Sequence, residues 1–502
     1  MTDTTAPAGQ TDVATPENAG DQGAVTGGAF GKKGLGWALF EWARNPYYNV
    51  IVIYVFASYF STVLVGDGVR GQALMGMTIG IAGVIMAIGA PIIGVLVDKG
   101  GGKKAFIAVA FVAIIACTLG MWWMKPGVPN VVPMAMALMV VGYSLYTVLE
   151  ILHNSMLPGA GESKALPMVS GLGLAMGNLA GVVMLVILIV ANEQSDWVKS
   201  IPGGVGSLSG LAVAIWMSIF VVPFFLMMPD HKGSLGSWSL AVKDTFSRES
   251  FKVRGRIPVL SFLASLFINP AIFVREKFKA YPNVMRYLLA RMIYADGTAV
   301  LFTMAGVYVA GVLKYSATEI MIYGIAGSLF GALGGFLGAK LDRWIGPKRA
   351  LIIELSIIVV FLIMQVSITS DSLLFGLIDG SQIVWAGPLF QTLSKVTYLL
   401  MVIPAAIIIV AAISSSRYML VHIAPPERIG EFYGFYSMAG SVTVWIAPMV
   451  VAYVTTVTNS QRAGMAAISL LFIVGIAILF TVKSDKTPEH MKTPAPDQGA
   501  GA

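Results

Sequence analysis

Two charged residues stand three positions apart in the first strongly apolar segment of the chain. Glu41 and Arg44 lie inside an apolar run over residues 37–65. Residues three apart share one face of an α-helix, so this carboxylate and guanidinium are within reach of an ion pair. An ionisable side chain inside lipid is costly unless it is paired or hydrated. We therefore expect either a gate or solute contact at this pair, or a structural ion pair near the membrane surface.

A second set of charges lies in the apolar run over residues 286–312. Arg291 and Asp296 are five residues apart, which turns them about 140° away from each other on a helix, so they are not expected to pair. Asp296 lies roughly 15 Å along the helix from Arg286 and is followed by Gly297. Two roles are open for Asp296. It is either a proton-titrating or amine-binding group facing a central cavity, or a structural partner of an arginine or a helix terminus.

Two further polar positions are candidates for binding. Glu150 and His153 are three residues apart near the end of an apolar run over 131–157, and a carboxylate beside an imidazole can relay a proton. Asn178 lies between Gly177 and Gly181. We expect Asn178 either to line a cavity or to form a hydrogen bond across helices.

The elements that would position these residues are membrane-spanning helices. Of 502 residues, 56% are hydrophobic and only 12% are charged, too few charges to cover a soluble protein of this length. Runs of about 20 apolar residues are long enough to cross a bilayer. Such runs predict an all-α polytopic membrane protein of about twelve helices, near 37–65, 73–97, 105–124, 131–157, 168–192, 205–228, 286–312, 320–341, 349–368, 396–420, 432–456 and 464–482.

The distribution of lysine and arginine orients these helices. Alternate loops carry one basic residue each, namely Arg70, Lys125, Lys199, Lys314, Lys395 and Arg462, whereas nearly all the others lie in the remaining loops and the two tails. By the positive-inside rule, the basic loops and both termini are cytoplasmic. We expect a bacterial-type inner (plasma) membrane protein.

The chain divides into two halves of six helices, 37–228 and 286–482. A polar tail precedes them (1–36) and another follows (483–502), and both are expected to be disordered in the cytoplasm. The basic linker 229–285 contains the apolar segment Pro258 to Val274, which we expect to lie flat on the membrane interface. The stretch Ser372 to Gln391 is broken by Gly and Pro and predicts a structured external insertion.

Composition and motifs argue against several other classes of protein. No G-x-x-x-x-G-K-[ST] phosphate loop, H-E-x-x-H or G-x-S-x-G occurs, the four histidines are scattered, and Cys117 is the single cysteine. We therefore expect no enzyme activity, no metal and no cofactor. The net charge of +7 follows from membrane topology, so no nucleic-acid partner is expected.

A short motif occurs twice, at equivalent places in the two halves. Residues 94–99 read G-V-L-V-D-K and residues 338–343 read G-A-K-L-D-R, each followed by glycine and a basic pair. The motif resembles the cytoplasmic signature of the major facilitator superfamily. Its aspartate can accept from helix N-termini or pair with an arginine, and its basic pair can anchor the loop at an anionic leaflet. The resemblance implies conformational-gate loops that contain Gly94, Asp98, Lys103, Lys104, Gly338, Asp342 and Arg343.

Four other segments resemble the vacuole effluxer family, the autophagy-related protein 22-like branch of that superfamily. They read W-A-L-F-E-W-A-R-N (37–45, ending at Asn45), N-S-M-L-P with V-S-G-L-G (154–158 and 169–173), Y-P-N with Y-A-D-G (281–283 and 294–297) and I-A-P-P with E-F-Y-G-F-Y (423–426 and 431–436). Arg44 and Ala295 depart from the family pattern, which has asparagine at both places. The resemblance implies movement of a solute across a membrane, and a eukaryotic branch is associated with amino-acid efflux from vacuoles.

These observations together favour a secondary active transporter that works by alternating access. We expect a monomer in the lipid bilayer that moves a small amino acid or peptide-like solute, coupled to a gradient of H⁺ or Na⁺. A sugar:cation symporter is an alternative, although such proteins carry paired acids in a second helix that has none here (73–97). A transport-fold sensor that docks a partner through the loop 229–285 is the other alternative.

Overall fold

The structure is a computed structural model of the 502-residue chain, and it describes residues 31–100, 103–161, 165–229, 274–441 and 443–484. Within these ranges, eleven helices are long and apolar enough to cross a membrane. A twelfth span is formed by two shorter helices in sequence, α16 and α17. The described residues therefore give a mostly helical, multi-pass membrane protein with about twelve spans in two six-span halves, as the sequence predicts.

The first half surrounds a very buried first span. This span comprises α1 (Lys32–Pro46), η1 (Tyr47–Tyr54), α2 (Val55–Tyr59) and η2 (Phe60–Leu64). The other spans of this half are α3 (Gly68–Gly100), α4 (Lys103–Gly120), α5 (Val131–Asn154), α6 (Leu166–Gln194), and α8 (Gly204–Phe220) with α9 (Val222–Met227); the short α7 (Asp196–Ser200) precedes α8.

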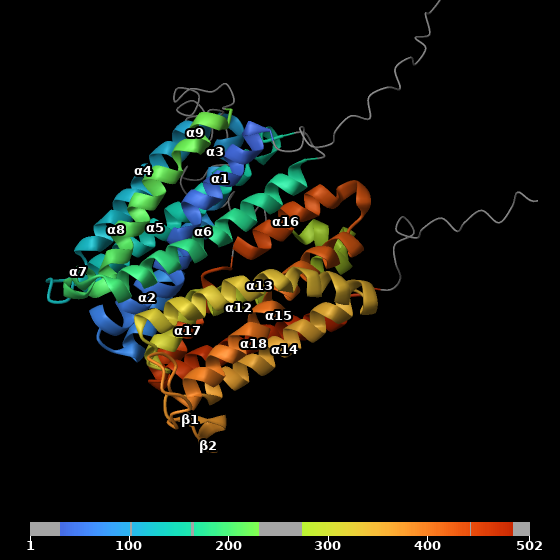
Figure 1. Cartoon of the computed structure of the whole chain (residues 1–502). Coiled ribbons are helices and arrows are strands. Elements are labelled where there is room, and N and C mark those ends of the chain that lie inside the picture. The colour runs from blue at the N-terminus through green and yellow to red at the C-terminus, as the bar shows by residue number, and fades with distance from the viewer. Residues whose placement is uncertain (1–30, 101–102, 162–164, 230–273, 442, 485–502) are drawn as a thin grey trace, which may run out of the picture.

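The second half has the same number of spans. They are α12 (Pro282–Gly311), α13 (Ala317–Ile345), α14 (Pro347–Ser367), α15 (Leu393–Ile423), α16 (Ile429–Ser441) with α17 (Ile446–Thr458), and α18 (Gln461–Thr481). Figure 1 shows the two halves as bundles that converge near α2, α12 and α17 and diverge toward α9 and α16.

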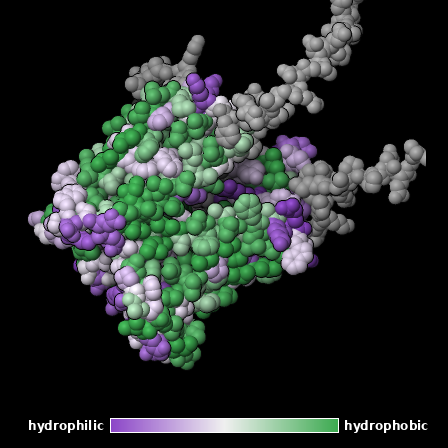
Figure 2. All heavy atoms as spheres, viewed as in Figure 1, coloured by the Kyte–Doolittle hydropathy of each residue, from purple (hydrophilic) through white to green (hydrophobic). Residues whose placement is uncertain are grey.

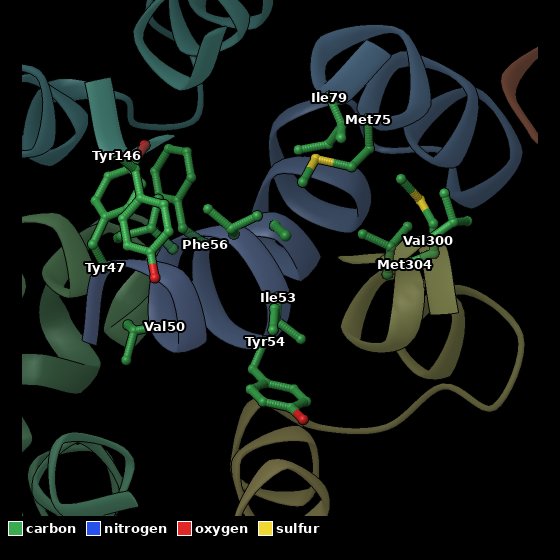
Figure 3. Packing of buried hydrophobic residues seen from close by; sticks show 14 of the residues in the cluster. Tyr47, Val50, Ile53, Tyr54, Phe56, Met75, Ile79, Tyr146, Val300 and Met304 are labelled. Atoms are coloured by element: carbon green, nitrogen blue, oxygen red, sulfur yellow. The ribbon is translucent and has the colours of Figure 1, made fainter. Parts of the chain in front are cut away.

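The first span lies at the centre of the contact between the bundles. Its middle part, η1, is a π-helix, a wider turn that is rare and frequent at functional sites. Figure 3 shows Tyr47, Val50 and Ile53 of this span among buried residues of α3, α5 and α12. A Cβ at position 306 of α12 would collide with the Ile53 carbonyl oxygen. Because Gly306 has none, the two backbones can touch there.

Hydrogen bonds join the bundles at the end where α3 and α18 begin. Gln72 of α3 is fully buried and donates to Thr455 Oγ1 (2.8 Å) and to the Gln461 carbonyl (3.0 Å). At the same end, Asn192 of α6 donates to Thr318 Oγ1 of α13 (3.1 Å). We call this the sealed end. The other end, where α3 meets α4 and α13 meets α14, is called the basic end because the loops with Lys103, Lys104 and Arg343 lie there.

The segment between α14 and α15 is a structured insertion, as predicted. It contains the antiparallel strands β1 (Ser372–Leu373) and β2 (Ile378–Asp379). Glu319 of α13 attaches it to the bundle by accepting from the Phe390 backbone N–H (2.6 Å), and also accepts from Lys395 Nζ in the first turn of α15 (2.7 Å). On its exposed surface, hydrogen bonds from the Ser381 hydroxyl and backbone N–H lower the pKa of Asp379.

The helix bounds differ from the sequence prediction in two places, and one predicted helix is not tested. Helix α1 already begins at Lys32, because Gly34 and Gly36 pack against Val169 and Met227; residues 1–30 lie outside the described part. The span expected over 432–456 is not one helix but two, α16 and α17. The interfacial helix expected from Pro258 lies outside the described residues up to position 273.

Candidate functional site

A cavity of about 1040 Å³ lies between the two bundles. Its walls come from α1, η1, α5 and α6 of the first half and from α12 to α16 of the second. Figure 2 shows hydrophilic residues inside a cleft between otherwise hydrophobic surfaces, in the region that lies between α6 and α16 in Figure 1. This volume is in the upper range of small-molecule sites.

Tyrosine is the most prominent residue type of the cavity wall. Three tyrosines of the first half stack almost in parallel, with ring centroids of Tyr48 and Tyr146 5.5 Å apart and those of Tyr143 and Tyr146 6.4 Å apart. Such walls offer hydroxyl groups for hydrogen bonds and ring faces for cations. The lining tyrosines are Tyr48, Tyr54, Tyr143, Tyr146, Tyr323, Tyr398, Tyr418 and Tyr433.

The predicted ion pair between Glu41 and Arg44 is present and lines the cavity. Arg44 Nη2 donates to both carboxylate oxygens of Glu41 at 2.9 Å. Its guanidinium also lies over the Tyr146 ring, 4.2 Å from the centroid, and 3.7 Å from a Glu150 oxygen. Glu150 is half exposed to the cavity, whereas Arg44 is almost fully buried. Arg44 therefore links two carboxylates of different exposure.

His153 pairs with a different carboxylate from the one that the sequence suggests. Its Nδ1 is 3.1 Å from Glu41 Oε1, and Glu150, three residues before it, faces Arg44 instead. The ring is fully buried and stacks on Trp37 (centroids 4.1 Å apart) and on Phe40 (4.4 Å). A partner more than a hundred residues away cannot be found from local spacing, so the expected Glu150–His153 relay is not formed here.

Two asparagines bring polar groups to the same wall. Asn178 of α6 is exposed and lines the cavity, as one of its two predicted roles requires. Asn45 also lines it, and its amide packs against Gly177, where a Cβ would collide. Gly173 accommodates Trp37 in the same way, one turn before. Glycines four apart on α6 therefore let α1 approach closely and set these side chains in place.

Arg291 and Asp296 are away from the cavity, at the interruption between α16 and α17. Arg291 stacks over the Tyr436 ring at 3.4 Å and donates to the Tyr436 carbonyl of α16 at 2.6 Å. Asp296 is 4% exposed and lies beside Thr443 and Ala447, which flank the start of α17. Asp296 thus does not face the central cavity. A cation near the end of one helix and an anion at the start of the next both suit the helix dipoles.

The gate motif of the second half lies at the basic end. Gly338 packs on Ala411 of α15, where a Cβ would lie 2.8 Å from its carbonyl oxygen. Asp342 is 6% exposed, and among the described residues it has no basic partner within ion-pair distance. The buried Glu354, a second carboxylate, lies near it, so the two groups repel each other when both are ionised. The exposed Arg343 donates to the Ala339 carbonyl of its own helix (3.2 Å).

In the first half, the basic pair of the motif binds carbonyl oxygens. Lys103 Nζ donates to Ser155 (3.0 Å), and Lys104 Nζ donates to Phe225 (2.8 Å) and Met228 (2.7 Å). Helix α3 includes Gly94 and Asp98, but the surroundings of these two residues are not among the described features. The basic pair therefore fixes the ends of neighbouring helices.

Sequence reasoning did not single out Arg417, which lines the cavity from α15 and is exposed to it. Because Arg417 lies near the end of a predicted span, the sequence groups it with the basic residues of the cytoplasmic loops, and nothing in the sequence distinguishes it from them. Glu150 and Arg417 come from α5 and α15, the fourth and tenth spans, which are equivalent in the two halves. The cavity therefore presents an exposed anion from one bundle and an exposed cation from the other.

Comparisons with known proteins agree with this architecture. The family model described as "Vacuole effluxer Atg22 like" matches residues 160–492. The chain is 21% identical over 465 residues to an uncharacterized MFS-type transporter, YxiO, of Bacillus subtilis (strain 168), which covers 92% of this chain and 97% of the relative.

Solved structures with the same fold are transporters. A D-xylose-proton symporter superimposes with a TM-score of 0.57 at 12% identity, covering 90% of this chain and 97% of the symporter. The nucleoside transporter NupG gives a TM-score of 0.56 at 12% identity, covering 90% and 98%. At such identities the likeness concerns the fold alone.

Proposed function

Because the chain belongs to the vacuole effluxer family (Atg22-like) and has the fold of major facilitator transporters, we propose that it is a secondary active transporter for a small zwitterionic solute. The solute class that fits is an amino acid or a short peptide. The proposal depends on one observation above all, which is the charge arrangement of the cavity.

The two exposed charges of the cavity have opposite sign and belong to different bundles. Glu150 of α5 can bind an ammonium group, and Arg417 of α15 can bind a carboxylate through its planar guanidinium. The other charged pair, Glu41 with Arg44, is already internally compensated. A solute with one positive and one negative group can satisfy both walls at once. A neutral sugar would leave the Arg417 charge uncompensated and Glu150 with only its 3.7 Å contact to Arg44.

The tyrosine-lined walls support the same solute class. The Arg44 guanidinium already lies over the Tyr146 ring, so the ring faces accept cations in this environment. Phenolic hydroxyl groups and the exposed Asn178 amide add neutral hydrogen-bonding groups. A binding site near the interface of two repeats is common in secondary transporters.

The contacts between the bundles support alternating access. The bundles are joined at the sealed end by Gln72, Thr455 and Gln461, whereas the cavity reaches Glu150 and Arg417 toward the basic end. Rocking about the central contact would close the basic end and open the sealed one. The positive-inside rule makes the basic end cytoplasmic, so this is an inward-facing arrangement with both termini in the cytoplasm.

The remaining features of the proposal follow from this picture. A gradient of H⁺ or Na⁺ would drive transport, and the working unit would be a monomer in a bacterial-type plasma membrane. Residues 37–228 and 286–482 would be the two rocking bundles, and the basic segment 229–285 would connect them on the cytoplasmic side.

The test is uptake by liposomes that contain the purified protein. The probe is an equimolar mixture of radiolabelled neutral amino acids, with D-xylose and uridine as separate probes. We expect saturable amino-acid uptake that falls at least tenfold in Glu150→Gln and in Arg417→Gln. The matched control is Glu427→Gln, which removes an exposed carboxylate outside the cavity and should leave uptake unchanged. Uptake of D-xylose or uridine without amino-acid uptake would refute the zwitterion assignment.

A further inference from the structure

The His153 ring is held between two hydrogen-bond acceptors. Nε2 is 2.9 Å from the Trp37 carbonyl oxygen, and Nδ1 is 3.1 Å from Glu41 Oε1. A carbonyl oxygen can only accept, so Nε2 must carry a proton to make the first contact. A neutral imidazole then has a bare lone pair on Nδ1, which would face the oxygens of the carboxylate.

His153 Nδ1 has no hydrogen-bond partner at its present geometry, and a proton shared with Glu41 Oε1, 3.1 Å away, would satisfy it. The proton either resides on Nδ1, which makes His153 an imidazolium that donates to Glu41, or on Glu41, which then donates to Nδ1. Without it, a lone pair would face an anion in a site that is fully buried on the histidine side. The contact is therefore a binding site for a single proton.

The surrounding charges fit a proton that comes and goes. Arg44 holds both Glu41 oxygens and lies near Glu150, and the next basic residues, Lys103 and Lys104, donate to carbonyl oxygens at the helix ends. With His153 as an imidazolium, two cations (Arg44, His153) face two carboxylates (Glu41, Glu150), and the group is neutral. Loss of the proton leaves one uncompensated negative charge beside the cavity.

Access to this proton leads through the cavity. Trp37, Phe40 and Phe224 cover the His153 ring with aromatic side chains, the last with centroids 6.1 Å apart. Glu41 is the member of the pair that lines the cavity. A proton on His153 therefore exchanges with water by way of the Glu41 carboxyl group, and only on the side to which the cavity is open.

We propose that Glu41 and His153 together hold the coupling proton of this transporter, an inference that rests on the proposed transport function. Proton loss would leave the ionised Glu41 with Arg44 as its sole cationic partner among these residues, and Arg44 is shared with Glu150. Because Glu150 is also the proposed ammonium site, proton occupancy and solute binding would act on the same arginine. This provides a direct link between the proton and the solute.

The proton can be observed without any knowledge of the solute. We would record nitrogen NMR spectra of the protein in liposomes with ¹⁵N-labelled histidine, and infrared difference spectra between acidic and alkaline pH. We expect either an imidazolium signal that is absent in His153→Phe or a protonated carboxyl band that is absent in Glu41→Gln. His153→Phe keeps the aromatic stack, and His422→Gln is the control that should retain both signals. A neutral His153 beside an ionised Glu41 between pH 5 and 8 would overturn the inference.

Coupling is tested by comparing two modes of transport with the same amino-acid mixture. In His153→Phe we expect uptake driven by a pH gradient to fall at least tenfold, while solute exchange at equal pH persists. Gradient-driven uptake equal to that of wild type would overturn the coupling role and leave the transport function intact. Absence of uptake and exchange in the wild type would instead refute the transport function, and the spectra would still decide whether the proton is bound.

Discussion

Glu41 and Arg44 allow a quantitative test of the buried charge network. Their side chains are 13% and 5% exposed, and Arg44 Nη2 lies 2.9 Å from both carboxylate oxygens. At an effective dielectric constant near 20, two unit charges 4 Å apart attract by about 4 kcal/mol. Solvent screening is weak at this exposure, but Glu150 and His153 can partly replace each lost partner.

We therefore expect each single change to cost stability and the two together to cost less than their sum. Glu41→Gln and Arg44→Met should each lower the unfolding free energy by about 2–4 kcal/mol, because each leaves a buried charge with a weaker partner. The double variant removes both charges, so the coupling energy should be about 2–3 kcal/mol. The measurement is denaturant titration in mixed lipid–detergent micelles, followed by circular dichroism.

Arg428 and Glu431 form the matched control cycle, with the same spacing of three residues. Their nearest nitrogen and oxygen are 3.7 Å apart, and the side chains are 51% and 32% exposed. An exposed pair of this kind contributes about 0.2–1 kcal/mol at most. If the Glu41–Arg44 coupling were no larger than this control, the assignment of a buried, mutually dependent pair would be refuted.

Two other predictions concern packing and the insertion between α14 and α15. Gly306→Val should lower the apparent melting temperature markedly, because the added atoms collide with the Ile53 carbonyl at the contact between the bundles. The control is Gly335→Ala, whose added Cβ meets open space and should change the melting temperature little. Equal shifts in the two variants would contradict the close approach at Gly306. Glu319→Gln should speed proteolytic cleavage within residues 372–392, as followed by mass spectrometry, because the contacts to Phe390 and Lys395 weaken. An unchanged cleavage rate would show that other contacts hold the insertion.

The fold could be predicted from the sequence because lipid imposes simple rules. Apolar runs of sufficient length and the alternation of lysine and arginine between loops give the twelve spans without any knowledge of tertiary contacts. The Glu41–Arg44 pair was equally accessible, since three-residue spacing on a helix determines which side chains are neighbours. Local geometry was enough in both cases.

Features that depend on contacts between distant helices were not accessible. His153 could be assigned only a local partner, whereas its actual partner, Glu41, is on another helix. For Asp296, a charged residue deep in a span, the sequence left open a cavity role and a structural role; it lies outside the cavity lining, beside the interruption between α16 and α17. That interruption and the π-helix of the first span leave no clear mark in hydrophobicity.

The contact between Gly306 and Ile53 is one place where the two bundles touch backbone to backbone, and in a molecule that rocks it would act as a pivot. Displacement grows with the length of the lever arm, so spin labels near the basic ends of α5 and α15 should report a large change in separation. A pair of labels placed on either side of the Gly306 contact should keep a nearly constant separation and serve as the reference measurement. The separations within the two pairs of labels would therefore distinguish a pivot at Gly306 from motion spread over the whole contact.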